Sequence, residues 1–446
     1  MTTTIDSDRS VADRAMGIGL RGLNWLAGSD LLDRIRIRKG VERALFQGTK
    51  GGFRTATAAG RTFKAAQKLG KPARQGRSKS KGLFDITPDD EQSMFREAGR
   101  AFAADKVRPA AKEADDERRT PPEILAQATD LGVAMLGVPA ELGGVMEEGA
   151  ATAAALIGEA LAHGDMGIAY AALAPGAVAT AIGLWGSAEQ EATYLPAFTE
   201  EDPPAAALAI LEPRALFDPL ALDTVAMRDG EDWIIDGAKS LVARATDCEL
   251  FLVAAEAEGI GPALFVVESG TSGLSVEDEP AMGLRPASTG RLILERARVP
   301  AIAILGDGAR ADYVECVNRA RIAWSSLAVG TAQAVLDYVI PYVNDRQAFG
   351  EPVSNRQGVA FAVAEIGIES SGMRLATYRA ASRADRGDDF GREAAIARRL
   401  CAQKGMKIGS DGVQLLGGHG FVKEHPVERW YRDLRSAGVM EGALLV

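Results

Sequence analysis

The spacing of apolar residues changes twice along the chain. Between residues 84 and 205 apolar positions recur at helical spacing, and Asp89 or Asp90 can cap the first helix of this part. Residues 206–310 hold short apolar runs typical of strands, and the helical period returns in residues 311–446. This order lacks the strand–helix alternation of a parallel sheet. It predicts an α+β fold with an N-terminal helical domain, a middle antiparallel β-domain and a C-terminal four-helix-bundle-like domain.

Local signals support this division. An Asp-Gly pair at 229–230 lies between two apolar runs, which predicts a β-hairpin. Pro341 falls within the first C-terminal helical pattern, where we expect it to kink the helix. A later segment carries a stripe of small residues that would let helices approach closely. The stripe consists of Ala397, Cys401, Gly405, Ile408, Gly412 and Leu415.

Residues 1–83 form a basic extension ahead of an acidic body. Residues 1–81 hold 18 Lys and Arg against 6 Asp and Glu, whereas the net charge of the whole chain is −10. Residues 70–82 have almost no apolar content and are typical of a linker. Apolar residues between Met16 and Leu26 recur at helical spacing beside arginines, so either a loosely ordered arm or an amphipathic helix on a membrane surface fits. Nucleic-acid binding fits less well, because few aromatic residues interleave with the charges.

Composition narrows the possible chemistry. Hydrophobic residues make up 47% and charged residues 25%, as in soluble globular proteins. We expect no membrane-spanning run and no secretory signal, and the three widely spaced cysteines favour a reducing cytoplasm. The three histidines have no metal-ligand spacing, so we expect no metal site. Carboxylates, backbone amides or an organic cofactor must then supply the chemistry.

Four motifs in the second half of the chain resemble those of the acyl-CoA dehydrogenases. Residues 345–350 with Gln357 are similar to the family's Arg-x-x-Phe-Gly…Gln signature, and residues 414–421 to its Gln-x-x-Gly-Gly-x-Gly-Phe segment. The stretch 282–300 resembles the Met-Gly-x-Arg…Val-Pro part of the β-domain, and residues 431–442 resemble Arg-Asp…Glu-Gly. The likeness covers roughly residues 84–446 and implies the acyl-CoA dehydrogenase fold.

The resemblance implies an FAD cofactor that lies at a subunit interface. Arg346 is similar to the arginine that meets the pyrophosphate, a role that suits a planar donor fork. Phe349 and Gln357 fall where the family packs and hydrogen-bonds the nucleotide. Gln414, Gly417 and Gly418 resemble the loop whose backbone approaches the adenosine half, which glycine permits because it has no Cβ.

The resemblance also implies that Glu441 is the catalytic base. A base must remove the α-proton of the thioester, and a carboxylate in a dry pocket has a raised pKa that suits this task. The backbone N–H of Glu441 would help to bind the developing oxyanion. Some relatives place the base before an arginine in the preceding helix, where this chain has Ala320 before Arg321.

The flavin side departs from the family pattern. The usual Thr-Glu-Pro-x-Ala-Gly-Ser-Asp is replaced at residues 211–218, where Leu211 and Phe217 stand for the two hydroxyl residues. The usual Trp-Ile-Thr is replaced by Leu241-Val-Ala243, so the stacking indole and the Thr hydroxyl are absent. Several lost hydrogen bonds, at about 1 kcal/mol each, would weaken FAD binding about 10- to 100-fold unless backbone donors compensate.

Three functions follow from these observations. The first is an FAD-dependent oxidoreductase that converts an acyl-CoA into a trans-2-enoyl-CoA and passes electrons to an electron-transfer flavoprotein. The second is a non-catalytic or flavin-poor subunit of a hetero-oligomeric acyl-CoA dehydrogenase. The third is a flavin-independent or oxidase-like relative. The resemblance further implies a homodimer or homotetramer, and the basic residues 1–81 leave peripheral membrane contact open for an otherwise cytoplasmic protein.

Overall fold

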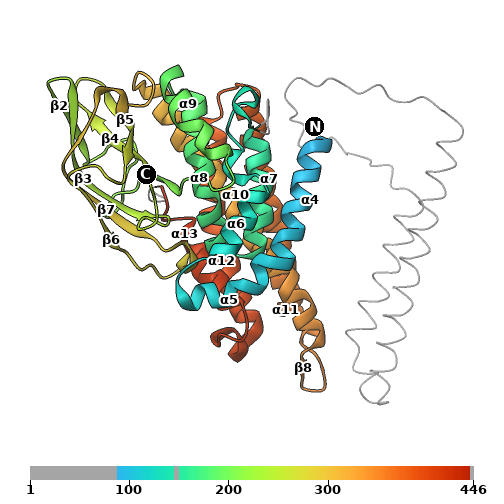
Figure 1. Cartoon of the computed structure of the whole chain (residues 1–446). Coiled ribbons are helices and arrows are strands. Elements are labelled where there is room, and N and C mark those ends of the chain that lie inside the picture. Colours follow the sequence, from blue (N-terminus) through green and yellow to red (C-terminus); the bar gives the residue numbers. More distant parts are fainter. Residues whose placement is uncertain (1–87, 145–149, 442–446) are drawn as a thin grey trace, which may run out of the picture. The chain divides into compact units, whose positions relative to one another are not determined.

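The computed structural model describes residues 88–144 and 150–441, which belong to one compact unit (Figure 1). The basic arm with its linker and possible amphipathic helix lies outside the described residues. Helices come first, then a sheet, then further helices, so the α+β order expected from the sequence is confirmed. The first helices are α4 (Asp90–Phe102), α5 (Arg108–Glu117), α6 (Pro122–Asp130), α7 (Ala150–Gly164), α8 (Met166–Trp185) and α9 (Ala188–Tyr194).

The N-terminal helices begin where side chains can satisfy their first amides. The Asp89 side chain accepts from the N–H of Gln92, which bonds back in a capping box, so Asp89 rather than Asp90 is the cap. The Asp165 side chain accepts from the N–H of Ile168 and so caps α8, without a reciprocal bond. Helix α8 is long and apolar enough to cross a membrane, which the sequence interpretation overlooked, but 67% of its most apolar window is buried within the protein. Burial in the core accounts for this composition.

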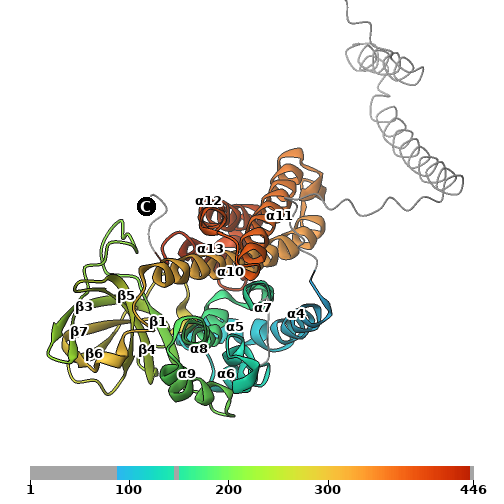
Figure 2. The ribbon, with the colours of Figure 1, turned by 90° about the horizontal axis from the view of Figure 1, so that it is seen from above.

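A seven-stranded sheet follows, and it packs beside the helices (Figure 2). The Asp-Gly pair makes the predicted hairpin between β2 and β3, which pair antiparallel. The sheet is mixed rather than antiparallel throughout, because β4 pairs parallel with both β1 and β2. The strands are β1 (Ala206–Ala209), β2 (Val225–Asp229), β3 (Asp232–Val242), β4 (Leu250–Ala257), β5 (Gly261–Glu268), β6 (Leu274–Asp278) and β7 (Gly290–Val299).

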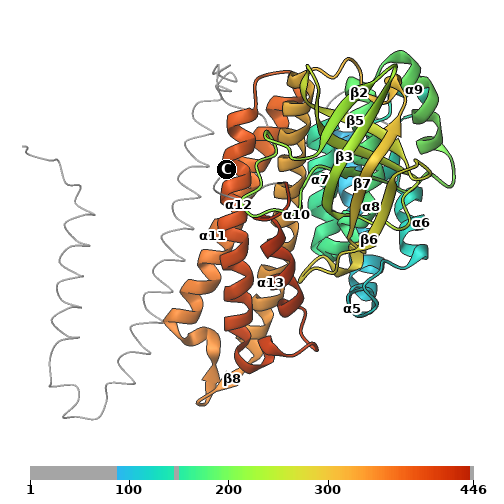
Figure 3. The ribbon, with the colours of Figure 1, turned by 90° about the vertical axis from the view of Figure 1, so that its left-hand side faces the viewer.

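Three long helices and a short one close the fold, and they lie side by side in Figure 3. Pro341 lies inside the first of them without ending it. The predicted small-residue stripe is confirmed: a Cβ on Gly412 would lie 2.8 Å from Cγ1 of Val335, and one on Gly405 would lie 3.4 Å from Cδ2 of Leu434. The elements are α10 (Arg310–Asp345), the hairpin strands β8 (Gln347–Ala348) and β9 (Glu351–Pro352), α11 (Gln357–Asp385), α12 (Gly391–Leu416) and α13 (Val427–Ser436).

Helix α13 is tied to both other domains by buried polar contacts. Arg432 makes a bidentate ion pair with Asp115 of α5, with N···O distances of 3.0 and 2.8 Å. Arg429 donates to the Asp165 carboxylate at the start of α8, and Asp433 accepts from the N–H of Leu284 in the β-domain. Helix α13 leads directly into the turn that carries Glu441, so these contacts position that turn.

Candidate active site

Glu441 lies in the turn after α13, with its side-chain oxygens inside the protein. Its Oε2 atom is buried and has no hydrogen-bond partner among the described residues. Burial raises the pKa of Glu441 to about 7, while nearby Arg398, a hydrogen bond from Trp324 and Arg321 oppose that increase. A carboxyl group that is half ionised near neutrality, with a free oxygen, can accept a proton.

The backbone around Glu441 is held in an unusual conformation. Its φ of 62° lies in the left-handed region, which costs a side-chain-bearing residue energy and persists only when its surroundings impose it. Arg398 of α12 donates to the carbonyl of Ala437 at 2.6 Å and also to the carbonyl of Met440. No described residue accepts a hydrogen bond from the Glu441 N–H. That N–H is available to a ligand.

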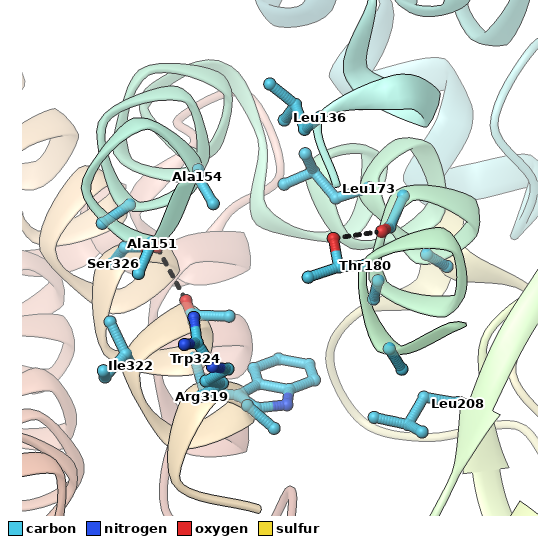
Figure 4. A pocket seen from close by; sticks show the side chains of 18 of the residues that line it. Leu136, Ala151, Ala154, Leu173, Thr180, Leu208, Arg319, Ile322, Trp324 and Ser326 are labelled. Carbon is cyan, nitrogen blue, oxygen red and sulfur yellow. Dashed lines mark hydrogen bonds between the residues drawn. The ribbon is translucent and has the colours of Figure 1, made fainter. Parts of the chain in front are cut away.

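Glu441 borders an apolar pocket of about 190 Å³ between α7, α8, α10 and β1 (Figure 4). Ala320 also lines it, so the position that carries the base in some relatives holds a methyl group here. Cys316, Tyr170 and Trp324 lie around Glu441 at the same pocket. Much of the remaining wall consists of small residues, which leave room for an aliphatic chain. They include Ala151, Ala154, Ala155, Gly158, Ala174 and Ala177.

A second, more open pocket of about 480 Å³ brings together four of the residues that resemble nucleotide ligands. Arg346 lies just beyond the C-terminal end of α10, and Gln414, Gly417 and Gly418 lie where α12 ends. None of the described carboxylates forms an ion pair with Arg346, since Glu351 pairs instead with Arg356 at 3.1 Å. The guanidinium is therefore available to a phosphate.

Two of the residues predicted to contact the nucleotide lie outside this pocket. Phe349 is 96% exposed at the tip of the β8–β9 hairpin, and its backbone is left-handed with φ of 54°. Gln357 is exposed at the first turn of α11. Both side chains could contact a ligand only if it extended beyond the pocket or if a second subunit covered them. Their assignment stays a prediction.

The two pockets are far apart in one chain. Ala320 lies beside Glu441, and Arg346 is 26 residues farther along the same α10. At 1.5 Å per helical residue this separation is about 39 Å. One dinucleotide cannot reach both pockets of the same chain.

The segments expected beside the flavin ring are buried and apolar. Leu211 is 9% exposed, Ala243 is fully buried, and Phe217 and the half-buried Leu241 belong to the same hydrophobic cluster. Leu216, where the family pattern has Gly, has φ of 52°, and Leu241 has φ of 54°. The backbone at Leu216 and Leu241 is thus left-handed, although the side chains of these segments differ from the family pattern.

Changing Leu216 to Gly tests this backbone strain. Leu216 is 65% exposed, so its side chain contributes little packing, and Gly would relieve a left-handed strain of about 1–2 kcal/mol. Greater freedom of the unfolded chain would offset about 0.4–1 kcal/mol of that gain. We expect Leu216→Gly to leave thermal stability unchanged or to raise it slightly.

The matched control is Leu284, which has φ of 53° but is only 3% exposed. Its replacement by Gly removes a buried side chain and should cost about 2–5 kcal/mol in the free energy of unfolding. Equal destabilisation of both variants in thermal unfolding would show that Leu216 is not strained.

These residues suit the two ends of FAD in different ways. The second pocket offers a free guanidinium and glycine backbone, which fit the pyrophosphate and adenosine. At the ring end Leu211, Leu241 and Ala243 have no side-chain donors, so polar contacts must come from the backbone. Residues 88–144 and 150–441 contain no cluster of His, Cys, Asp or Glu that could hold a metal ion. The side chains fit FAD, with fewer polar contacts at its ring.

The sequence interpretation missed Trp324, Tyr170 and Arg398 as site residues. Trp324 follows Ala320 by one helical turn, so both share a face of α10. That spacing was a usable signal, because Ala320 occupies a position known to bear a base in relatives. The contacts of Tyr170 and Arg398 join elements distant in sequence, and no local pattern indicates them.

Known proteins share this arrangement over most of the chain. Acyl-CoA dehydrogenase family models match residues 89–202 (N-terminal domain), 207–297 (middle domain) and 306–444 (C-terminal domain). The chain is 30% identical to an acryloyl-CoA reductase (NADH) of Anaerotignum propionicum, over 80% of this chain and 93% of that protein. It is 31% identical to the mitochondrial short-chain specific acyl-CoA dehydrogenase of Bos taurus, over 80% and 87%.

A solved structure of a known enzyme is also similar to this chain over most of its length. The butyryl-CoA dehydrogenase of Megasphaera elsdenii is 26% identical, with a TM-score of 0.75 over 81% of this chain and 97% of that one. All three domains are matched in order, and sequence identity extends over four fifths of the chain. The chain therefore belongs to the acyl-CoA dehydrogenase family of oxidoreductases.

Proposed function

We propose that this protein removes two hydrogens across the α,β bond of an acyl-CoA thioester and forms a trans-2-enoyl-CoA. The observation that carries this proposal is the Glu441 carboxyl, with a pKa of about 7, at the edge of an apolar pocket wide enough for an acyl chain. Ionised Glu441 takes the α-proton through Oε2, which has no other described partner. Bound FAD would supply the hydride acceptor for the β-hydrogen.

The residues of this chain contribute three further effects. The apolar walls exclude water, which strengthens the electrostatic interactions of the carboxylate. The N–H of Glu441 can donate to the thioester oxygen as negative charge develops there. Arg346, Gln414, Gly417 and Gly418 would hold the nucleotide half of FAD that serves another subunit. We therefore infer a homodimer or a dimer of dimers, with an electron-transfer flavoprotein as the electron acceptor.

A second candidate function is a flavin-poor subunit paired with a catalytic relative. Buried Leu211, Phe217 and Ala243 beside the expected ring position favour it, because they replace polar or stacking contacts. The buried carboxyl of Glu441 favours catalysis instead, since a non-catalytic chain gains nothing from an unpartnered Oε2. A cytoplasmic location with membrane contact through residues 1–81 stays a prediction.

Flavin absorbance tests the proposal. The purified protein should be yellow and should bleach when an acyl-CoA is added without oxygen. The bleaching rate should rise with pH and level off above a midpoint of about 7, because Glu441 acts only when it is deprotonated. Stopped-flow absorbance over a series of pH values measures this curve.

Two results would exclude the catalytic proposal. One is a colourless protein that gains flavin only with a co-expressed partner, which would support the subunit hypothesis. The other is a flavoprotein that no acyl-CoA of any chain length reduces.

A further inference from the structure

Arg398 is a buried arginine of α12 that contacts the turn carrying Glu441. It is 7% exposed. Its Nη1 donates to the carbonyl oxygen of Ala437 at 2.6 Å, and its Nη2 donates to the carbonyl oxygen of Met440. Both carbonyls follow the end of α13 at Ser436, where a helix no longer supplies N–H partners. Because a guanidinium is a planar donor fork, it can hold two acceptors in one fixed arrangement.

The carbonyl of Met440 and the N–H of Glu441 belong to the same peptide unit. A trans peptide is planar, so its C=O and its N–H point in opposite directions. Among the described residues no peptide bond is cis. The Met440 carbonyl points to Arg398, so the Glu441 N–H points away from α12. Glu441 lines the apolar pocket, whereas none of the described lining residues belongs to α12. The contact with Arg398 therefore sets the direction of an N–H that lies at this pocket.

We propose that Arg398 is a positioning residue that orients the Met440–Glu441 peptide so that its N–H can donate to the thioester oxygen of a bound acyl-CoA. The proposal rests on the proposed function, because this orientation matters only if a thioester binds beside Glu441. The φ of 62° at Glu441 supports it, since a left-handed conformation persists only where neighbouring groups impose it. A donor that is oriented beforehand needs no reorganisation as negative charge develops on the oxygen.

The charge of Arg398 has a separate effect on Glu441. Burial lowers the pKa of Arg398 to about 10, so the guanidinium stays protonated at neutral pH. Its positive charge opposes the increase that burial causes in the pKa of Glu441. Loss of this charge would move the midpoint of the curve of reduction rate against pH. Loss of the peptide orientation would instead lower the plateau of that curve, so the two effects can be measured separately.

The other ionisable groups near Glu441 and Arg398 keep a constant charge near neutrality. Arg321 of α10 stays protonated, as arginines do in proteins. Burial raises the pKa values of the remaining groups, which are therefore neutral at physiological pH. They are Tyr170 of α8, Tyr313 and Cys316 of α10 and Cys401 of α12. A midpoint near 7 in the rate curve therefore reports Glu441.

Arg398→Lys separates orientation from charge. Lysine keeps the positive charge but is a point donor on a flexible stem, without the planar fork. Removal of one oxyanion donor typically lowers kcat by about 10²- to 10³-fold, so a misdirected donor should lower the plateau rate of flavin reduction by about 10- to 100-fold. The midpoint should stay near 7. Arg398→Met also loses the charge, so its midpoint should move up by about one pH unit.

Arg399 provides the matched control, because it follows Arg398 in α12 but is exposed. Arg399→Met removes the same charge, and its plateau and midpoint should equal those of the parent protein. A plateau in Arg398→Lys equal to that of the parent would overturn the orienting role. If Arg398→Met does not fold, because two buried carbonyls have lost their donor, Arg398→Lys still decides the question.

Crystal structures of the parent protein and of Arg398→Lys test the orientation without requiring activity. In the variant the Met440–Glu441 peptide should turn, and φ of Glu441 should leave the left-handed region. A peptide with the same orientation in both structures would overturn the proposal. If no acyl-CoA reduces the parent protein, the proposed function fails, yet this comparison still decides whether Arg398 orients the peptide.

Discussion

Glu441→Gln should retain bound flavin but lose substrate-driven bleaching. Glutamine has nearly the same shape as glutamate, so folding should be little affected. Its amide cannot take up the α-proton at neutral pH. General bases typically contribute about 10²- to 10⁴-fold to a rate, so the bleaching rate constant should fall by at least roughly this factor. Anaerobic stopped-flow absorbance with an acyl-CoA measures the loss.

An exposed glutamate outside the pocket provides the matched control. Glu424 lies shortly before α13 and is exposed, so Glu424→Gln makes the same chemical change away from the pocket. We expect it to bleach like the parent protein. Bleaching by Glu441→Gln at a rate close to that of the parent would remove this residue from the mechanism. Equal losses in both variants would indicate a general effect of lost charge.

The residual bleaching rate of Glu441→Gln should depend little on pH. In the parent protein the rate follows ionisation of Glu441, with a midpoint of about 7, because burial raises its pKa. Glutamine has no such ionisation, so any residual rate in Glu441→Gln should lack that midpoint. A residual rate with an unchanged midpoint would indicate a different titrating base.

The sequence alone predicted those structural features that depend on residues close together along the chain. The Asp-Gly pair specifies a tight hairpin, so the pairing of β2 with β3 was predictable from a few residues. The sequence predicted a helix cap at Asp89 or Asp90, and the structure shows that Asp89 is the cap of α4. The small-residue stripe on α12 likewise predicted close helix packing, and Gly412 against Val335 confirms it.

Features set by contacts between distant segments were not predictable in this way. The parallel pairing of β1 with β4 joins residues about 40 positions apart, and each strand alone resembles an antiparallel one. The exposure of Phe349 depends on where a two-strand hairpin projects, which its motif does not specify. The contact of Tyr170 with Leu241 depends on the docking of α8 against the sheet. The motif indicated Glu441, which lines the apolar pocket, but not the residues around it.

The buried ion pair between Asp165 and Arg429 should be essential for stability. Asp165 is fully buried, accepts from the N–H of Ile168 at 3.0 Å as the cap of α8, and pairs with Nε of Arg429 at 2.9 Å. Asp165→Ala leaves a buried guanidinium without this carboxylate. Breaking such a pair from one side costs about 3–5 kcal/mol in the free energy of unfolding. Chemical unfolding followed by far-ultraviolet circular dichroism measures the loss.

The control is an exposed ion pair in the same part of the fold. Asp116 pairs with Lys112 at 3.0 Å and with Lys423, but its side chain is 36% exposed. Water stabilises the lysines when the carboxylate is removed, so Asp116→Ala should cost only about 0–1 kcal/mol. Because Arg429 lies on α13, which leads into the Glu441 turn, Asp165→Ala should also slow bleaching, whereas Asp116→Ala should not. Equal stability of the two variants would show that burial does not set the strength of the Asp165 contact.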